Sequence, residues 1–303
     1  AGRVIDPVFL HSPQYVCEPL SARLGVRVVL KVETVNPIRC FKGRGAEYFV
    51  SKAARGKRLL CASAGNFGQA MAYSCRKRGI PLTVYAGVHA NELKLDRIRG
   101  MGATVVLEGE DFDQAKEAGR RAAEAQGARW VEDGLEPAIA EGAGTIALEL
   151  LECPEPIDAI LVPVGNGALI TGIGFVMKQL RPSIKVIGVQ SAGAPAMVES
   201  WRSGSIVTHP SMDTIADGIG VRVPIPEAVE DMREAVDDAL LVQEDTIRRA
   251  MRLLHEDAGM VVEPSGAAAI AAVVENEQRF RGLTVAAIVC GGNLTSEQMY
   301  RWL

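Results

Sequence analysis

The sequence NPIRCFKGRGA, residues 36–46, places one lysine, Lys42, between an apolar run and two glycines. A lysine held in a largely apolar pocket loses the solvation of its ammonium group, which makes the neutral, nucleophilic amine accessible for Schiff-base chemistry. Taken alone, Phe-Lys-Gly also fits an exposed lysine at the start of a helix. Three other segments favour the chemical role.

Two of these segments run from an apolar strand through small residues into a helix. In SAGNFGQ, residues 63–69, such a turn exposes backbone amides at the positive end of a helix, where a carboxylate can be held. In VPVGNGAL, residues 162–169, the amides can point at a phosphate. Position 170 is Ile, so the third glycine of a dinucleotide fingerprint is missing, and a simple phosphate ester fits better than a pyrophosphate. Either segment alone also fits an ordinary strand-to-helix turn.

The third segment, AAIVCGGNL at residues 286–294, is a buried-strand pattern that ends in Cys290. In a parallel sheet, the carboxyl ends of the strands carry the ligand crevice. A thiol at this position therefore indicates a binding site, although an isolated buried cysteine also acts simply as a small hydrophobic residue.

In this order, the four segments resemble the pyridoxal-phosphate enzymes of fold type II, in particular the threonine/serine dehydratase family. The motifs TIADG at 214–218 and VEPSGA at 262–267 extend the resemblance over nearly the whole chain. It implies an α/β fold of the tryptophan synthase beta-like type, with two domains that each contain a mostly parallel sheet flanked by helices. The expected large cofactor-binding domain comprises residues 1–57 and 138–303, and the expected small mobile domain residues 58–137.

The resemblance also assigns roles to single residues. Lys42 corresponds to the lysine that forms the Schiff base with pyridoxal 5'-phosphate and then removes the α-proton of the substrate. The residues expected to bind the cofactor are Phe41, Lys42, Asn66, Gly165, Asn166, Gly167, Ala168, Leu169, Glu263 and Cys290. Those expected to contact the substrate are Arg39, Ser63, Ala64, Gly65, Asn66 and Phe67.

The activity implied is dehydrative deamination of a β-hydroxy amino acid, such as L-threonine or L-serine, to a 2-oxo acid and ammonia. A neutral thiol such as Cys290 beside the pyridine nitrogen cannot keep that nitrogen protonated as a carboxylate would, which favours elimination. The resemblance implies that the departing hydroxyl takes its proton from the cofactor phosphate. Alternatives are β-replacement, a lyase for hydroxyaspartate- or phenylserine-type substrates, and a non-catalytic ligand-binding relative.

Several positions depart from the family pattern. Ile38-Arg39-Cys40 replaces Thr-Gly-Ser, and we hypothesise that Arg39 either pairs with a distal acidic group of the substrate or extends to the surface. Phe67 replaces a common histidine, and Ala64 stands where related racemases carry a serine, which disfavours racemisation. Gln190 replaces the cation-binding glutamate, so a dependence on metal is not expected.

Composition excludes several other classes of protein. The formal net charge of −4 over 303 residues gives no electrostatic footprint for nucleic acid. Six cysteines without a C-x-x-C pair indicate reduced thiols rather than a metal or disulfide framework, and no apolar stretch approaches the roughly 18 residues of a membrane span. We expect a cytoplasmic protein, and the resemblance implies a homodimer. Because no segment follows Leu303 that corresponds to the regulatory extension of biosynthetic threonine dehydratases, a catabolic or specialised role is expected.

Alternating apolar runs and helical periodicity predict parallel sheets covered on both faces. The expected strands are 28–32, 59–63, 82–86, 104–107, 160–164, 186–189 and 285–289. The expected helices are 44–54, 69–78, 112–125, 143–151 and 246–255, with a small-residue helix at 267–274.

Overall fold

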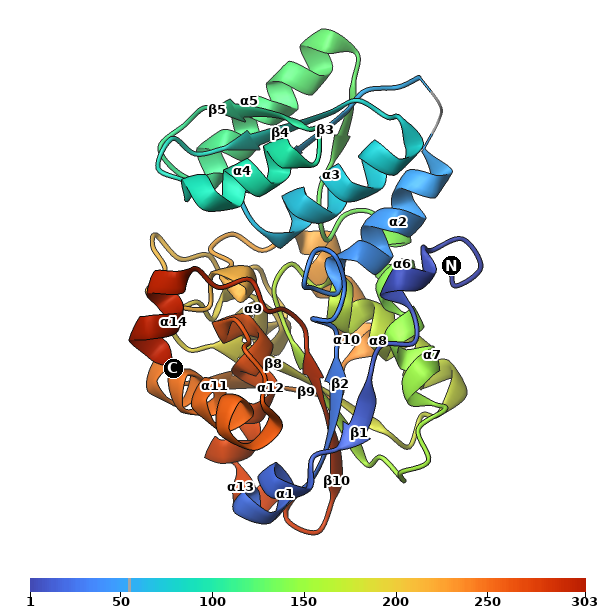
Figure 1. The fold of residues 1–303 in the computed structure, drawn as a ribbon, viewed down its shortest axis with the longest axis vertical. Helices are drawn as coiled ribbons and strands as arrows, with labels where there is room; N and C mark the ends of the chain where they lie inside the picture. The colour runs from blue at the N-terminus through green and yellow to red at the C-terminus, as the bar shows by residue number, and fades with distance from the viewer. Residues whose placement is uncertain (54–55) are drawn as a thin grey trace.

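The computed structural model describes residues 1–53 and 56–303, and its strands form two sheets, one above the other in Figure 1. In the larger sheet the strand order is β1-β2-β10-β7-β8-β9, and every neighbouring pair is parallel except β1 and β2. Its strands are β1 (Gln14–Val16), β2 (Arg27–Val32), β7 (Ala159–Pro163), β8 (Lys185–Ser191), β9 (Asp238–Val242) and β10 (Thr284–Val289).

The smaller sheet has the order β5-β4-β3-β6 and is parallel throughout. Its strands are β3 (Leu59–Ala62), β4 (Leu82–Ala86), β5 (Thr104–Leu107) and β6 (Arg129–Val131). β3 lies inside the sheet and β6 at its edge, and both strands lead into residues of the site described below.

Helices cover both faces of the larger sheet, because its side chains alternate between two hydrophobic clusters. One face carries α1 (Glu18–Leu24), α11 (Glu244–Ala258), α12 (Pro264–Glu275), α13 (Glu277–Phe280) and α14 (Ser296–Trp302). The other carries α6 (Pro137–Ala143), α7 (Thr145–Leu150), α8 (Ala168–Leu180), α9 (Ala196–Ser203) and α10 (Pro226–Ala235).

The smaller sheet is enclosed in the same way. One face packs on α2 (Lys42–Lys52), α3 (Asn66–Arg78) and α4 (Glu92–Gly100), and the other on α5 (Phe112–Gln126). Two short 3-10 turns, Pro7–Phe9 and Asp217–Ile219, complete the described elements.

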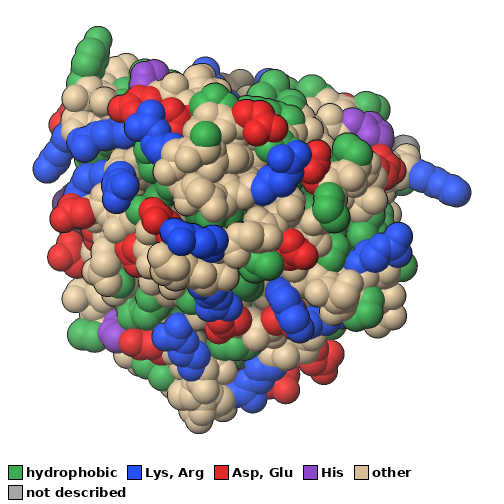
Figure 2. Space-filling model, turned by 90° about the horizontal axis from the view of Figure 1, so that it is seen from below, with side chains coloured by type: hydrophobic (Ala, Val, Ile, Leu, Met, Phe, Trp, Pro, Cys, Tyr) green, Lys and Arg blue, Asp and Glu red, His purple; other side chains and the backbone are tan. Residues whose placement is uncertain are grey.

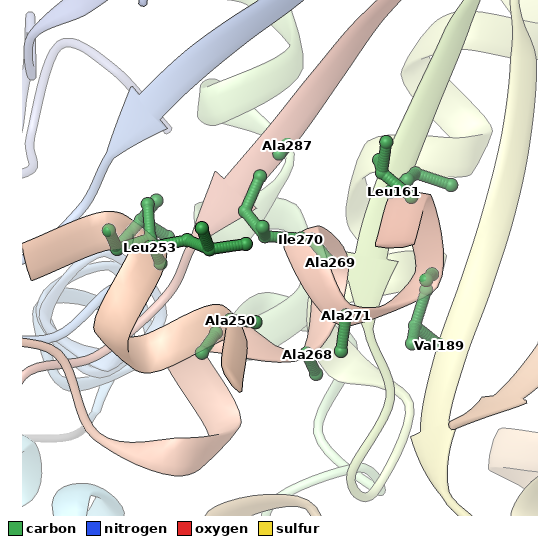
Figure 3. Close-up of a cluster of buried hydrophobic side chains, with 14 of the residues drawn as sticks. Leu161, Val189, Ala250, Leu253, Ala268, Ala269, Ile270, Ala271 and Ala287 are labelled. Atoms are coloured by element: carbon green, nitrogen blue, oxygen red, sulfur yellow. The ribbon is translucent and has the colours of Figure 1, made fainter. Parts of the chain in front are cut away.

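Helix α12 confirms the expected small-residue helix and shows why its side chains are small. It lies between the larger sheet and α11, so almost every position is buried (Figure 3). Alanines on several sides allow the backbone to approach both neighbours, while Ile270 fills the remaining space between α11 and the sheet.

All seven expected strands are present, but three short strands, β1, β6 and β9, were not predicted. Each has at most five residues, and β1 and β6 have only three, too few for an alternating pattern to be recognised. The helix expected at 143–151 is confirmed as α7, which begins two residues later, at Thr145, and Gly144 separates it from the unpredicted helix α6. The helix expected at 44–54 begins at Lys42 and ends at Lys52, and position 54 lies outside the described residues.

The strands of the smaller sheet all fall within the expected small domain, residues 58–137. However, α2 belongs to the expected large domain and still contributes Phe49 and Val50 to the hydrophobic cluster that contains Cys61 and Met71. Helix α2 therefore connects the two sheets. The domain limits and the mobility of the smaller domain remain predictions.

No helix among the described residues is both long enough and apolar enough to cross a membrane.

Candidate active site

The carboxyl ends of strands from both sheets meet at one cavity of about 740 Å³. Segments after β7 and β10 reach it from the larger sheet, and segments after β3 and β6 reach it from the smaller sheet. Every residue expected to bind cofactor or substrate lines this cavity except Arg39. The residues that the sequence grouped as a candidate site therefore share one cavity, which the two sheets assemble from distant segments.

Lys42 is the first residue of α2, and its side chain is 14% exposed. The Nζ atom lies 5.1 Å from the ring centroid of Phe41 and 5.9 Å from that of Phe67. Its ion-pair partner is Asp133, which follows β6. The amine is thus held between aromatic rings and one carboxylate.

A buried network of charges fixes the start of α2. Arg44 is fully buried and donates two hydrogen bonds of 2.8 Å to Glu33, which follows β2. It also donates bonds of 2.6 and 2.9 Å to the two carboxylate oxygens of Glu149 on α7. Burial alone would raise the pKa of Glu149, but hydrogen bonds and charge from Arg44 and Lys31 lower it to about 2. The helix that begins with Lys42 is therefore tied to the larger sheet and to α7.

The glycine loop between β7 and α8 has a backbone that restricts the side chains it can carry. Gly167 has φ +91°, a left-handed conformation, and a Cβ on Gly165 would lie 3.1 Å from the carbonyl oxygen of Gly218. The loop leads directly into the 13-residue helix α8. A helix N-terminus preceded by small residues fits a phosphate group.

Cys290 follows β10 and is 4% exposed, with its Sγ donating to the carbonyl oxygen of Ser265 at 3.4 Å. Burial, reinforced by the charge of Glu263, raises the pKa of the Cys290 thiol well above its usual value, so the group is a neutral thiol. The hydroxyl of Ser265 also faces the cavity and is a buried group without a hydrogen-bond partner among the described residues. A bound ligand with a polar edge would satisfy it.

Asn66 joins the loop after β3 to the larger sheet. Its Nδ2 donates to Glu263 at 2.7 Å, and its Oδ1 accepts from Asn293 at 2.8 Å. The other oxygen of Glu263 accepts from the backbone N–H of Asn293 at 3.1 Å. Burial and the negative charge of Asp217 raise the pKa of Glu263 to about 7.

A family model described as pyridoxal-phosphate dependent enzyme matches residues 8–291. The chain belongs to this family. The orphaned Ser265 hydroxyl, the glycine loop at α8 and the partly buried Lys42 amine all fit its cofactor, pyridoxal phosphate. The structure is accordingly that of a fold type II pyridoxal-phosphate enzyme.

Known members of this pyridoxal-phosphate dependent family resemble the chain over almost its whole length. An L-threonine ammonia-lyase of Thermotoga maritima is 37% identical over 97% of this chain and 74% of its own length. The biosynthetic chloroplastic threonine dehydratase of Arabidopsis thaliana is 34% identical over 96% of this chain, which spans only 50% of that relative. The processed form of threonine deaminase isoform 2 from Solanum lycopersicum superposes with a TM-score of 0.91 at 31% identity, over 97% of this chain and 87% of that structure.

Arg39 is exposed and does not line the cavity, which favours the second of the two alternatives, extension to the surface. Sequence reasoning did not identify Asp133, Ser265 or Asn293 as site residues. Ser265 and Asn293 lie within motifs that were recognised, VEPSGA and CGGNL, so their position was available. Asp133 follows an unpredicted three-residue strand, and only the folded chain places it beside Lys42.

The face shown in Figure 2, which is seen from below the view of Figure 1, carries Lys and Arg side chains intermingled with Asp and Glu. The residues on that face form no uniform charged patch.

Proposed function

We propose that this enzyme dehydrates and deaminates a β-hydroxy amino acid, with L-threonine and L-serine as the favoured substrates, to give a 2-oxo acid and ammonia. The observation that carries the proposal is that the Lys42 amine and the neutral thiol of Cys290, which follows β10, line the same cavity. The named activities of the relatives support the same reaction class.

Named residues would hold the cofactor within the cavity. Gly165, Asn166 and Gly167, together with the start of α8, would bind its phosphate. Cys290 and Ser265 would face its ring nitrogen, and Asn66 its phenolic oxygen. Once bound, pyridoxal phosphate weakens the α-carbon–hydrogen bond of an attached amino acid by withdrawing electrons into its ring.

The residues of the chain then perform the proton transfers and the positioning. The turn of residues 63–67 would bind the substrate carboxylate at the N-terminus of α3, where backbone N–H groups favour an anion. Lys42 Nζ takes the α-proton, the β-hydroxyl leaves as water, and the remaining enamine is hydrolysed to the 2-oxo acid and ammonium. The aromatic rings of Phe41 and Phe67 limit access of water to the amine.

Ala64 also lines the cavity. Racemisation requires a proton donor on the face of the α-carbon opposite to Lys42, and the methyl group of Ala64 cannot supply that proton. The proposal therefore excludes racemisation as a main activity. β-Replacement is the remaining alternative within the enzyme class, and it requires a second nucleophile.

The test is an assay of 2-oxo acid and ammonia with L-threonine, L-serine, hydroxyaspartate and phenylserine. We expect product from L-threonine and L-serine without any added nucleophile. Borohydride reduction followed by peptide mass spectrometry should locate the pyridoxyl group on Lys42, and Lys42→Ala should lack it. Product that forms only when a second nucleophile is supplied would reject dehydration.

We also propose that the protein is a cytoplasmic homodimer and that the domain of residues 58–137 moves relative to the rest of the chain. All six cysteines are free thiols, and five of them are buried, as expected for a reducing compartment. Light scattering coupled to size exclusion would measure the oligomeric state directly, and a monomer would reject the dimer.

A further inference from the structure

Asp133 lies at the carboxyl end of β6, beside the reactive lysine. Its side chain is 8% exposed and lines the same cavity as Lys42, with Oδ2 in contact with Lys42 Nζ. Among the described residues this is the ion pair that Lys42 makes. A carboxylate in direct contact with the amine that accepts the α-proton can affect each step in which that proton moves.

The second oxygen of this carboxylate has no partner. Asp133 Oδ1 is buried and without a hydrogen bond among the described residues. Its neighbour Glu132 differs, because both of its oxygens accept hydrogen bonds, from Lys116, Arg120 and Trp130. A buried carboxylate oxygen that lacks a donor and borders a ligand cavity indicates that the ligand supplies the donor.

The backbone after Asp133 fixes the carboxylate in position. Gly134 has φ +96°, and a Cβ at this position would lie 2.4 Å from the carbonyl oxygen of Asn166. The turn after β6 is therefore packed against the glycine loop expected to bind phosphate. Asp133 is held between that loop and Lys42 rather than on a free segment.

We propose that Asp133 is the acid–base partner of Lys42 and a determinant of substrate class, an inference that rests on the proposed dehydration. Oδ2 stabilises the ammonium that Lys42 becomes when it takes the α-proton. Oδ1 accepts a hydrogen bond from the β-hydroxyl of the substrate. The site therefore selects substrates with a hydrogen-bond donor on the β-carbon and disfavours those with an additional carboxylate nearby, such as hydroxyaspartate.

The proton balance of the step is simple. The α-carbon–hydrogen bond breaks and an N–H bond forms on Lys42. With its hydrogen directed at Asp133 Oδ1, the β-hydroxyl presents a lone pair to the Lys42 ammonium on the same side of the substrate. The ammonium returns its proton to that oxygen as the carbon–oxygen bond breaks, so water leaves and both Lys42 and Asp133 regain their starting charges.

Other titratable groups surround this pair. Two cysteines, Cys40 and Cys290, lie close enough to interact electrostatically with both Lys42 and Glu263. A third, Cys61, interacts in the same way with Asp133. Burial raises the pKa of each of the three thiols, which keeps them neutral. Asp133 is the group in direct contact with the amine, so a comparison of wild type with Asp133→Asn isolates its charge.

The decisive experiment compares L-serine with β-chloro-L-alanine in the wild-type holoenzyme and in Asp133→Asn. Chloride leaves without a proton and offers no hydrogen-bond donor, so it does not need Asp133 Oδ1. Because the asparagine amide oxygen still accepts a hydrogen bond, the variant loses only the difference between a charged and a neutral acceptor, about 1–1.5 kcal/mol. The ratio of kcat/KM for L-serine to that for β-chloro-L-alanine should therefore fall about 5-fold to 10-fold in the variant.

A second readout does not depend on turnover. The visible absorbance of the bound cofactor is recorded as a function of pH, because a carboxylate beside the Lys42 nitrogen favours its protonated form. In Asp133→Asn the spectral change should move to lower pH. Glu141→Gln, which removes an exposed ion pair with Lys52 on α2, is the control and should behave as wild type in both readouts.

The proposal requires both changes. An unchanged substrate ratio in Asp133→Asn, as expected if the cofactor phosphate alone handles the hydroxyl, overturns it, and so does an unchanged pH titration. If Asp133→Asn fails to fold, Asp133→Ser removes the carboxylate without adding bulk and is judged by the same criteria. A wild-type enzyme that uses β-chloro-L-alanine but neither L-serine nor L-threonine would instead refute the proposed function.

Discussion

Replacing Arg44 with methionine should destabilise the protein severely, although residue 44 does not line the cavity. Methionine has a similar length and removes the charge, so the change isolates the electrostatic contribution. Arg44 donates hydrogen bonds to both carboxylate oxygens of Glu33 and to both of Glu149. In the variant these two buried carboxylates lose Arg44, and Lys31, which pairs with Glu149, is the cation that remains in the network. Breaking a buried ion pair in this way costs about 3–5 kcal/mol.

The pH dependence of this loss has a defined sign. The pKa of Glu149 is about 2 in the folded protein against an ordinary value of 4.5, which at about 1.4 kcal/mol per pKa unit corresponds to about 3 kcal/mol. Because the folded pKa is depressed, this stabilisation is complete above pH 4.5 and is lost as the pH falls towards 2. Burial lowers the pKa of Lys31 despite its pairing with Glu149, so Arg44 is the dominant stabilising cation.

The assay is urea unfolding followed by circular dichroism between pH 3 and pH 7. The difference in unfolding free energy between wild type and Arg44→Met should be about 3–5 kcal/mol at pH 7 and should narrow in acid. Lys52→Met is the matched control on the same helix, since its ion pair with Glu141 is about half exposed and such pairs contribute about 0–1 kcal/mol. A difference below about 1 kcal/mol at pH 7, or one that stays constant down to pH 3, would refute the electrostatic reasoning.

Three further predictions follow from single residues. Chelation with EDTA should change neither the melting temperature nor the rate of deamination, because Gln190, in place of a cation-binding glutamate, already donates to Ile219 and accepts from Val198. A loss of activity or of thermal stability that Ca²⁺ or Mg²⁺ restores would contradict this. In the cofactor-free protein, the raised pKa of Glu263, about 7, predicts that the unfolding free energy falls by about 3 kcal/mol as the pH rises from 4.5 to 7. Glu263→Gln should abolish this fall, which urea unfolding at pH 5 and pH 8 measures. The same change of unfolding free energy with pH in both proteins would contradict the prediction. Gly134→Ala should lower the unfolding free energy by at least about 1–3 kcal/mol, because strain in its left-handed backbone adds to a clash with Asn166. Gly127→Ala is the control, since residue 127 has φ +60° but lies in open space, so only the backbone strain lowers its stability. Similar losses of stability in both variants would count against the clash.

Local sequence patterns were sufficient for most of the strands and helices and for recognising the segments that line the cavity. A strand that runs into glycines and then into a helix is encoded by neighbouring residues, so the loops after β3, β7 and β10 could be recognised. The parallel arrangement then brings their carboxyl ends to one edge of each sheet. The position of Lys42 at a helix start and of Cys290 at a strand end required no knowledge of distant contacts.

The tertiary structure alone decided which charged side chains meet. Asp133 is 91 positions from Lys42 and Glu149 is 105 positions from Arg44, and no periodic pattern links residues so far apart. The same limit explains why the pattern left two alternatives for Arg39, because the direction of a side chain in an irregular loop depends on the backbone around it, here at φ +53°. Local sequence thus determines most helices, strands and loops and the positions of Lys42 and Cys290 on them. Which charged residues pair, such as Lys42 with Asp133 and Arg44 with Glu149, is decided only when distant segments pack together.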